Sequence, residues 1–146
     1  MKFTLIHDPD IEEEVIVKVR KPSLLTEQIE ALVLQHNGLD RIAGYHDDEI
    51  KMLSFQQIEC ITVLGGKTYA IDICNQKYRL KQRLYEIEAT LPSSFIRINK
   101  STLANESHIE RFIPTFSGAV DAVFRCGHRD YVSRRCFSQI KRRYRR

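Results

Sequence analysis

The sequence lacks tryptophan, and it has few of the residues that mark fibrous or disulfide-rich proteins. Its 146 residues include 4 prolines, 6 glycines and 4 cysteines, which excludes a collagen-like or low-complexity chain. No apolar run approaches the roughly 18 residues of a membrane-spanning helix. The apolar stretch at the N-terminus ends at His7 and is too short for a signal peptide. The sequence therefore predicts a cytoplasmic protein with one or two small domains.

The cysteines are too widely spaced for a common metal or redox motif. Cys60, Cys74, Cys126 and Cys136 include no Cys-x-x-Cys pair, and without a secretory signal we expect reduced thiols. Cys126, His128 and Cys136 match no standard zinc pattern and lack a clear fourth ligand. The sequence predicts no metal and no cofactor.

Motifs for catalysis are also missing. The chain contains no His-Glu-x-x-His or Gly-x-Ser-x-Gly element, and the Gly-Gly-Lys run at 65–67 lacks the spacing of a phosphate-binding loop. The sequence alone does not exclude a catalytic triad whose residues come together only on folding. We nevertheless predict a protein that is not an enzyme, with no catalytic residues and no small-molecule substrate.

What the sequence does have is an uneven distribution of charge. Residues 1–49 hold 5 Lys and Arg against 11 Asp and Glu, a net charge of −6, and residues 50–146 hold 18 against 8, a net charge of +10. Seven of the last 13 residues are basic and none is acidic. This asymmetry predicts a basic module that meets a polyanion and an acidic region that does not.

The acidic part has the pattern of a small strand-strand-helix unit. Residues 2–6 and 14–20 are apolar or alternate like strands. Residues 25–36 carry apolar side chains at helical spacing, with Ser23 or Thr26 as a cap and Asn37-Gly38 as a stop. We expect residues 1–44 to form an accessory unit suited to packing or dimerisation.

Short strands and tight turns fill the rest of the chain. Strands are predicted at 51–55, 58–64, 68–74, 78–80, 95–98, 109–113, 119–125 and 130–132. Short helices are predicted at 84–91, before Pro92, and after Ser133. Residues 45–146 are thus predicted to form a mainly antiparallel β module with short helices, giving an α+β fold overall.

Two motifs in this module resemble the LytTR family of bacterial DNA-binding domains. The first is a short helix and Leu-Pro at 91–92, followed by Phe-Ile-Arg-Ile-Asn-Lys-Ser at 95–101 and by Asn105. The second is Val-Ser-Arg-Arg at 132–135, which opens the last helix. The resemblance covers residues 47–144. The acidic lead is similar to that of small stand-alone regulators of this family, which lack a receiver domain.

The resemblance implies a LytTR-type β fold that binds duplex DNA through loops and regulates transcription. The implied contacts come from the hairpin loop, the segment before Ser101 and the start of the last helix: Lys67, Thr68, Asn99, Lys100, Ser133, Arg134 and Arg135. The hydroxyl of Ser101 can donate to DNA as well. It also implies paired DNA repeats and a homodimer.

Residue chemistry supports these positions independently. We expect Lys100 and Arg135 to read bases, because lysine and arginine donate to guanine O6 and N7. Ser133 and Arg134 suit phosphates, whereas Lys67 suits either. Further along the last helix, phosphate affinity without sequence information is expected from Lys141, Arg142, Arg145 and Arg146. For Arg97 and Asn105, a structural role within the fold is the alternative to a DNA contact.

Two other functions stay open at this stage. One is a protein-interaction module, whose N-terminal unit binds a regulatory partner such as a small membrane protein. The other is RNA binding, which a basic β surface also permits, although the stacked aromatic pair of an RNA-recognition sheet is absent.

Overall fold

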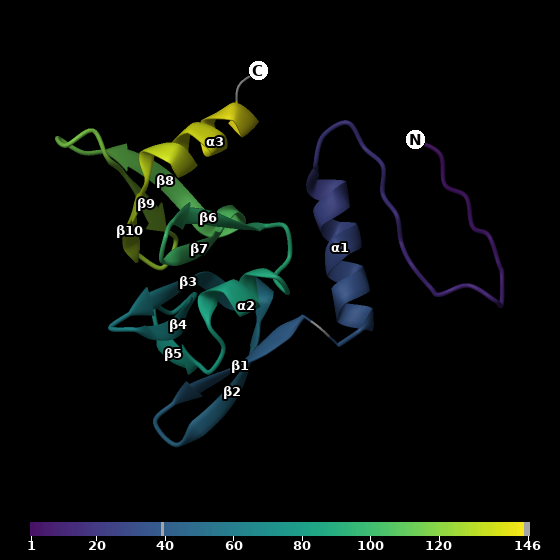
Figure 1. Ribbon diagram of the computed structural model, residues 1–146, viewed down its shortest axis with the longest axis horizontal. Helices are drawn as coiled ribbons and strands as arrows, with labels where there is room; N and C mark the ends of the chain where they lie inside the picture. The colour runs from purple at the N-terminus through teal and green to yellow at the C-terminus, as the bar shows by residue number, and fades with distance from the viewer. Residues whose placement is uncertain (39, 145–146) are drawn as a thin grey trace.

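The computed structural model describes residues 1–38 and 40–144, and it places a β module beside a helix, α1, and an extended N-terminal segment (Figure 1). Within these residues the helices are α1 (Leu24–His36), α2 (Leu84–Glu88) and α3 (Arg134–Tyr144), with single 3₁₀ turns at Phe55–Gln57 and Glu106–His108. The strands are β1 (Arg41–His46), β2 (Glu49–Ser54), β3 (Ile58–Leu64), β4 (Lys67–Asp72), β5 (Lys77–Leu80), β6 (Phe95–Asn99), β7 (Thr102–Asn105), β8 (Ile109–Pro114), β9 (Val120–Phe124) and β10 (Arg129–Val132).

In the described part of the chain, the strands form two antiparallel sheets. The larger sheet has the order β2-β1-β5-β4-β3-β7-β6, and the smaller has the order β10-β9-β8. The β3–β4 hairpin has the predicted Gly65-Gly66 turn, in which both glycines have positive φ, a conformation that side chains with a Cβ rarely adopt. The mainly β fold class predicted from the sequence is confirmed.

The larger sheet has a hydrophobic core on each face. Successive residues of β3 point to opposite faces, so Ile61 and Cys60 enter different cores. Ile61 packs in a buried cluster with Ile87 of α2. Cys60 packs in a second buried cluster with Phe124 of β9 and Ile140 of α3. The second core therefore holds the smaller sheet and α3 against the larger sheet.

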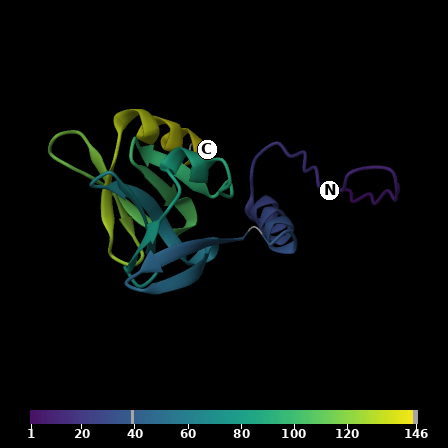
Figure 2. The same cartoon turned by 60° about the horizontal axis from the view of Figure 1, so that its bottom comes forward.

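The N-terminal residues differ from the prediction. Residues 1–23 contain no strand, so the strands predicted at 2–6 and 14–20 are wrong for the single chain, and the predicted strand-strand-helix unit contains only its helix. The segment runs away from the β module (Figures 1 and 2). Alternation of side chains predicts which face of a strand is apolar, but a strand also needs a neighbour for its backbone hydrogen bonds, and none lies beside this segment.

Helix α1 follows its sequence signals closely. Ser23 accepts a hydrogen bond from the Thr26 backbone, and the Thr26 hydroxyl accepts one from the Ser23 backbone N–H. Asn37 ends the helix, and Gly38 has a φ of 68°. The predicted boundary between residues 44 and 45 falls inside β1, which pairs with β2 along its whole length.

Candidate nucleic-acid interface

Backbone hydrogen bonds bring three turns to one side of the β module. The Val63 N–H, at the end of β3, donates to the Ser101 carbonyl over 2.9 Å. The Ser133 N–H, just before α3, donates to the Ile98 carbonyl of β6 over 2.8 Å. The β3–β4 turn, the β6–β7 turn and the start of α3 are therefore neighbours, although they lie far apart in the sequence.

A network of partly or fully buried polar side chains supports the same three turns. The hydroxyls of Thr62 and Thr102 are 2.8 Å apart, and Thr102 donates to the Asp130 carboxylate over 2.6 Å. Asn99 donates to Asp130 over 3.3 Å and to the Tyr131 carbonyl over 2.8 Å. The network crosses from β3 through β7 to β10, so it joins the two sheets beneath the turns.

The structure separates the predicted contact residues into exposed and buried groups. The exposed side chains are those of Lys67, Lys100, Arg134, Arg135, Lys141 and Arg142, and Ser101 and Ser133 are half-buried. Thr68 is 7% exposed and Asn99 is 1% exposed. Arg145 and Arg146 lie outside the described residues. The exposed cations are thus available to a polyanion, whereas the Asn99 amide is engaged within the fold.

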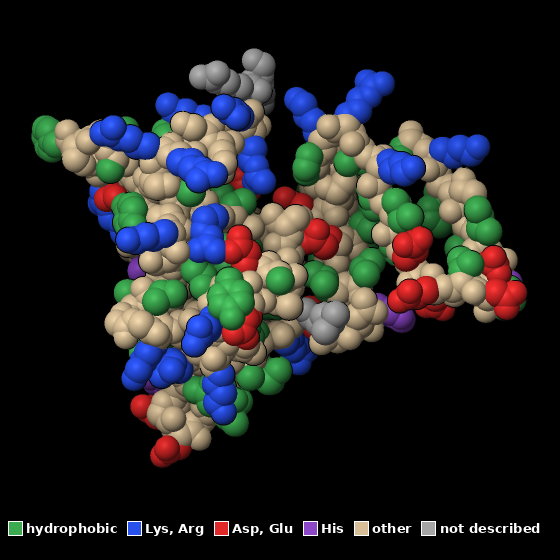
Figure 3. Space-filling view, in the orientation of Figure 1, with side chains coloured by type: hydrophobic (Ala, Val, Ile, Leu, Met, Phe, Trp, Pro, Cys, Tyr) green, Lys and Arg blue, Asp and Glu red, His purple; other side chains and the backbone are tan. Residues whose placement is uncertain are grey.

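Helix α3 presents one apolar face and one basic face. The Ser133 hydroxyl accepts a hydrogen bond from the Cys136 N–H over 3.2 Å, as expected for a helix cap. Ile140 is buried against the sheets. Arg135 and Arg142 are seven residues apart, so they share the other face of the helix. Figure 3 shows Lys and Arg side chains gathered over α3 and the strands beside it.

The two arginines at the start of α3 differ in their contacts. Arg134 donates to the Ser117 carbonyl in the β8–β9 loop over 3.4 Å, so part of its bonding capacity is used inside the chain. Arg135 forms no ion pair with a described carboxylate. Its guanidinium is therefore the more available of the two for a base edge.

Arg97 and Asn105, for which the sequence left open a structural role or a DNA contact, both bond within the fold. Arg97 forms an ion pair with Glu88 of α2 and donates to the Lys100 carbonyl over 3.0 Å. It thereby braces the turn that carries Lys100. Asn105 is 3% exposed and donates to the Ile58 carbonyl over 3.1 Å. Both contacts agree with the structural alternatives predicted from the sequence.

Sequence reasoning missed the three supporting residues Thr62, Thr102 and Asp130. Asp130 carries the one signal that could have found it, because it is the only acidic residue after Asp121 in a strongly basic stretch. A lone carboxylate there indicates either a solvent-exposed charge or a buried acceptor. Thr102, which bonds to Asp130, and Thr62, which bonds to Thr102, gave no such signal, since threonine is common in strands.

The cysteines and histidines near the β9–β10 turn do not gather into a metal site. Among the described residues, no three His, Cys, Asp or Glu side chains are placed to hold a metal ion. Burial raises the pKa of the Cys126 thiol and raises that of Cys60 well above its ordinary value. Both thiols therefore stay protonated and unreactive near neutral pH.

The half-buried His128 ring makes the stability of the fold sensitive to acid. The ring lies against Phe124, with centroids 5.7 Å apart, and Nε2 has no hydrogen-bond partner among the described residues. Burial lowers the pKa of His128 below its ordinary value, and nearby Lys77 lowers it further, while Asp130 and Glu59 oppose the shift. The unfolded chain thus takes up a proton at higher pH than the folded chain.

Acid unfolding of a His128→Phe variant tests this linkage. The stability that depends on neutral His128 is present above about pH 6.5 and is lost as pH falls toward the lower pKa of the folded state. We expect His128→Phe to reduce the fall in unfolding free energy between about pH 7 and 5, as measured by urea denaturation. His7→Phe, at an exposed position in the N-terminal segment, is the matched control for the substitution, and the slope should stay that of the wild type. Equal slopes for wild type and His128→Phe would contradict the assignment.

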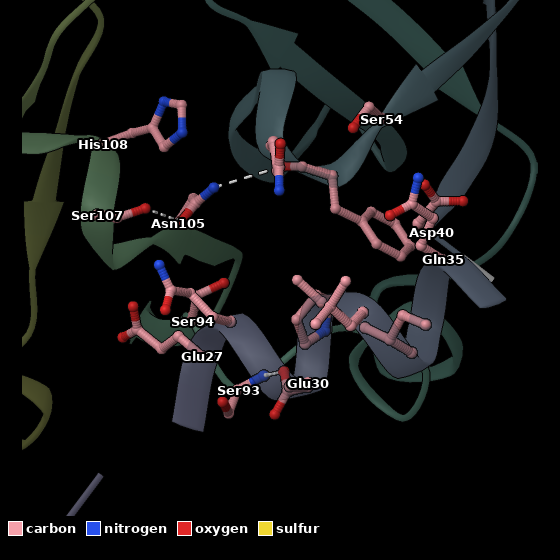
Figure 4. A pocket seen from close by; sticks show the side chains of 17 residues that line it. Glu27, Glu30, Gln35, Asp40, Ser54, Ser93, Ser94, Asn105, Ser107 and His108 are labelled. Carbon is pink, nitrogen blue, oxygen red and sulfur yellow. Dashed lines mark hydrogen bonds between the residues drawn. The ribbon is translucent and has the colours of Figure 1, made fainter. Parts of the chain in front are cut away.

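A cleft of about 720 Å³ lies between α1 and the β module. Figure 4 shows Glu27 and Glu30 of α1 on one side and Ser94, Asn105 and His108 of the module on the other. The Ser93 N–H donates to the Glu30 carboxylate over 2.5 Å. The cleft is thus acidic on its α1 side and polar on its module side, in contrast to the basic side formed by the three turns.

The fold is a mainly antiparallel β module with exposed cations on adjacent turns, an arrangement that suits a polyanion. The family model described as the LytTr DNA-binding domain matches residues 48–145. The chain therefore belongs to the LytTr DNA-binding domain family. Membership in this family makes the chain a DNA-binding protein and not an enzyme.

Known proteins resemble the chain along its whole length as well as in the domain. An uncharacterized HTH-type transcriptional regulator of Staphylococcus aureus (strain COL) is 33% identical over 146 residues, covering 98% of this chain and 97% of the relative. A relative from strain MW2 is 33% identical and covers 90% of both chains. The solved LytTr DNA-binding domain of a methyl-accepting/DNA response regulator from Bacillus cereus has a TM-score of 0.65 at 24% identity, and covers 72% of this chain and 96% of that one.

The order of helices and strands shows whether the described helices include a helix-turn-helix. Helices α2 and α3 are separated by β6 to β10, and α1 and α2 by β1 to β5. A helix-turn-helix joins two helices through a turn of three or four residues, so the described helices do not form one. No helix in the described ranges, 1–38 and 40–144, is long and apolar enough to cross a membrane.

Proposed function

We propose that this protein is a sequence-specific transcriptional regulator that reads duplex DNA with the turns on the basic side of its LytTr domain. Lys100 and Arg135 contact base edges, and Lys67 contacts a base or a phosphate. Arg134, Ser101 and Ser133 contact phosphates or support the base contacts. Lys141 and Arg142 add affinity that is independent of sequence.

The observation that carries the proposal is the joining of three cationic turns by short hydrogen bonds. The bonds from Val63 to Ser101 and from Ser133 to Ile98 fix the turns relative to one another. Base readout requires donors at fixed separations, because each base pair presents its acceptors at set positions in the groove. A merely basic surface without such fixed turns would bind phosphates alone.

The proposal gives Thr68 and Asn99 positioning roles in place of DNA contacts. Asn99 Oδ1 accepts the Ser101 N–H over 2.8 Å, and its amide donates to the Tyr131 carbonyl. These bonds shape the turn that presents Lys100. Thr68 is buried in β4 directly after Lys67.

Selection from random duplex DNA tests the proposed function. The full-length protein at near-physiological salt is expected to enrich a single motif, and to bind it at least about 10³-fold more tightly than random duplex. Adding RNA as a competitor separates duplex DNA recognition from RNA recognition. Enrichment of no motif, with binding that only falls with salt, would contradict sequence-specific regulation.

The proposal includes a homodimer that binds two DNA repeats, one with each domain. Two linked domains bind two half-sites with an avidity far above that of one, which suits a domain of this size with few base-reading residues. Its target, genomic DNA, would place the protein in the bacterial cytoplasm. Selection would then return the motif as a spaced repeat.

A second candidate function belongs to the extreme N-terminus. Phe3, Leu5 and Ile6 are 87%, 83% and 77% exposed, so three large apolar side chains close together in the sequence are left uncovered, as at a protein interaction site. They suit a regulatory protein partner, such as a small membrane protein. This function requires a different protein and not a second copy of the chain.

A further inference from the structure

The segment at 13–21 has one apolar face that is only partly covered. Val15, Val17 and Val19 line an open groove of about 380 Å³ together with Ile29 and Val33 of α1. The three valines remain 60%, 41% and 43% exposed. Helix α1 itself has no fully buried residue. The valine face and α1 therefore face each other without forming a closed core.

Charges are arranged along the same segment with opposite signs at its two ends. Glu13 and Glu14 precede the valines, and Arg20 and Lys21 follow them. Two parallel copies would place like charges side by side. Two antiparallel copies would place each acidic end against the other copy's basic end, which is the favourable arrangement for directly opposed side chains. The pattern is thus complementary to itself.

We infer that residues 13–21 of two copies pair as an antiparallel β-ribbon with its two-fold axis at Val17. In this register Val17 faces Val17, and Val15 faces Val19. Glu14 faces Arg20, and on the valine side Glu13 faces Lys21. All six valines then lie on one face of the ribbon, because side chains alternate along a strand.

The ribbon would give residues 13–21 a neighbouring strand, which they lack in the single chain. Each copy provides the backbone partner that the other segment needs for its N–H and C=O groups. The two α1 helices cover the shared valine face, which matters because a bare two-stranded ribbon is at best marginally stable in water. A symmetric contact of this kind is also the usual basis of a homodimer. The inference rests on the proposed function, to which it adds the surface that links two DNA-binding domains.

Replacing Val17 by aspartate in the full-length protein tests the ribbon. Val17→Asp places two carboxylates opposite each other on the apolar face, so the dimer dissociation constant is expected to rise about 100-fold or more. Sedimentation velocity without DNA measures this constant. Ile50→Asp also replaces an exposed apolar side chain by aspartate, in β2 and outside the ribbon, and it should dimerise like the wild type.

A charge exchange tests the register. In the proposed register Glu14→Arg weakens the dimer about 10-fold at low salt, as does Arg20→Glu, and the double variant returns to within about 3-fold of wild type. A register shifted to pair Val15 with Val17 would instead place Glu14 against Lys18 and Arg20 against Glu12. Each single substitution would then oppose like charges, and the double variant would be weaker than either single variant.

Separate measurements distinguish failure of the ribbon from failure of the proposed function. A wild-type protein that stays monomeric, or a Val17→Asp variant that dimerises normally, overturns the ribbon. Binding of one selected half-site should be unchanged in Val17→Asp, while binding to the paired repeat weakens. Absence of any selected motif overturns the proposed function, whatever the result of sedimentation.

Discussion

Glu59→Ala is expected to lower the unfolding free energy by about 2–5 kcal/mol, because two hydrogen-bonding groups lose their partner at about 1–3 kcal/mol each. The Glu59 side chain is fully buried in β3. One carboxylate oxygen accepts the Cys126 N–H over 2.8 Å, and the other lies 2.7 Å from His108 Nδ1. Removal of the carboxylate leaves both groups without their partner between the two sheets. Urea denaturation at neutral pH measures the loss.

Two controls isolate the role of the carboxylate. Glu59→Gln keeps an acceptor for the Cys126 N–H and should lose less stability than Glu59→Ala. Glu110→Ala, at an exposed position in β8, should change the unfolding free energy by less than about 0.5 kcal/mol. A loss below about 1 kcal/mol in Glu59→Ala would show that the buried carboxylate does not hold the sheets together.

Arg135→Ala is expected to weaken binding to the selected DNA motif by about 1–3 kcal/mol, which is about 5- to 150-fold, and to relax specificity at one base position. Binding to random duplex should change little, because a lost base contact affects only DNA that carries the base. Fluorescence anisotropy with selected and scrambled duplexes at one stated salt concentration measures both effects.

Arg41→Ala is the matched control for this loss of a guanidinium. Arg41 is exposed at the start of β1, which is separated from β3 by β5 and β4. Its replacement removes one positive charge at a position away from the three turns. The affinities for the selected and the scrambled duplex should therefore both stay close to those of the wild type. An equal loss on both duplexes in Arg135→Ala would make Arg135 a phosphate contact.

Much of the β module could be predicted because its local signals agree with its tertiary structure. The strand at 58–64 and the Gly65-Gly66 turn occur where the pattern placed them. Strands β1 and β7 were missed for different reasons. All four residues of β7 are buried, so it lacks the alternation of a half-buried strand. β1 contains Gly44, whose missing Cβ leaves room for Leu53 and Tyr78. A glycine within a strand weakens the local signal that would predict it.

The candidate site was only partly predictable for a different reason. Motif resemblance located the turns that carry Lys100 and Arg135, but it could not tell an exposed side chain from a buried one. Asn99 is next to Lys100 in the sequence, yet its amide turns inward to the Tyr131 carbonyl. The supporting contacts cross between sheets, as do those of Glu59 with His108, and no spacing along the chain encodes them.

The polar network beneath the turns has a consequence for how regulators of this design could diverge. Asn99, Thr102 and Asp130 hold the turns in place from within, whereas Lys67, Lys100 and Arg135 extend outward. If the outward side chains read bases as proposed, their substitution would alter which operator is preferred while the scaffold keeps its shape. New binding specificities would then be reachable by single steps that preserve folding, and duplicated copies of the gene could acquire separate targets without passing through an unfolded intermediate.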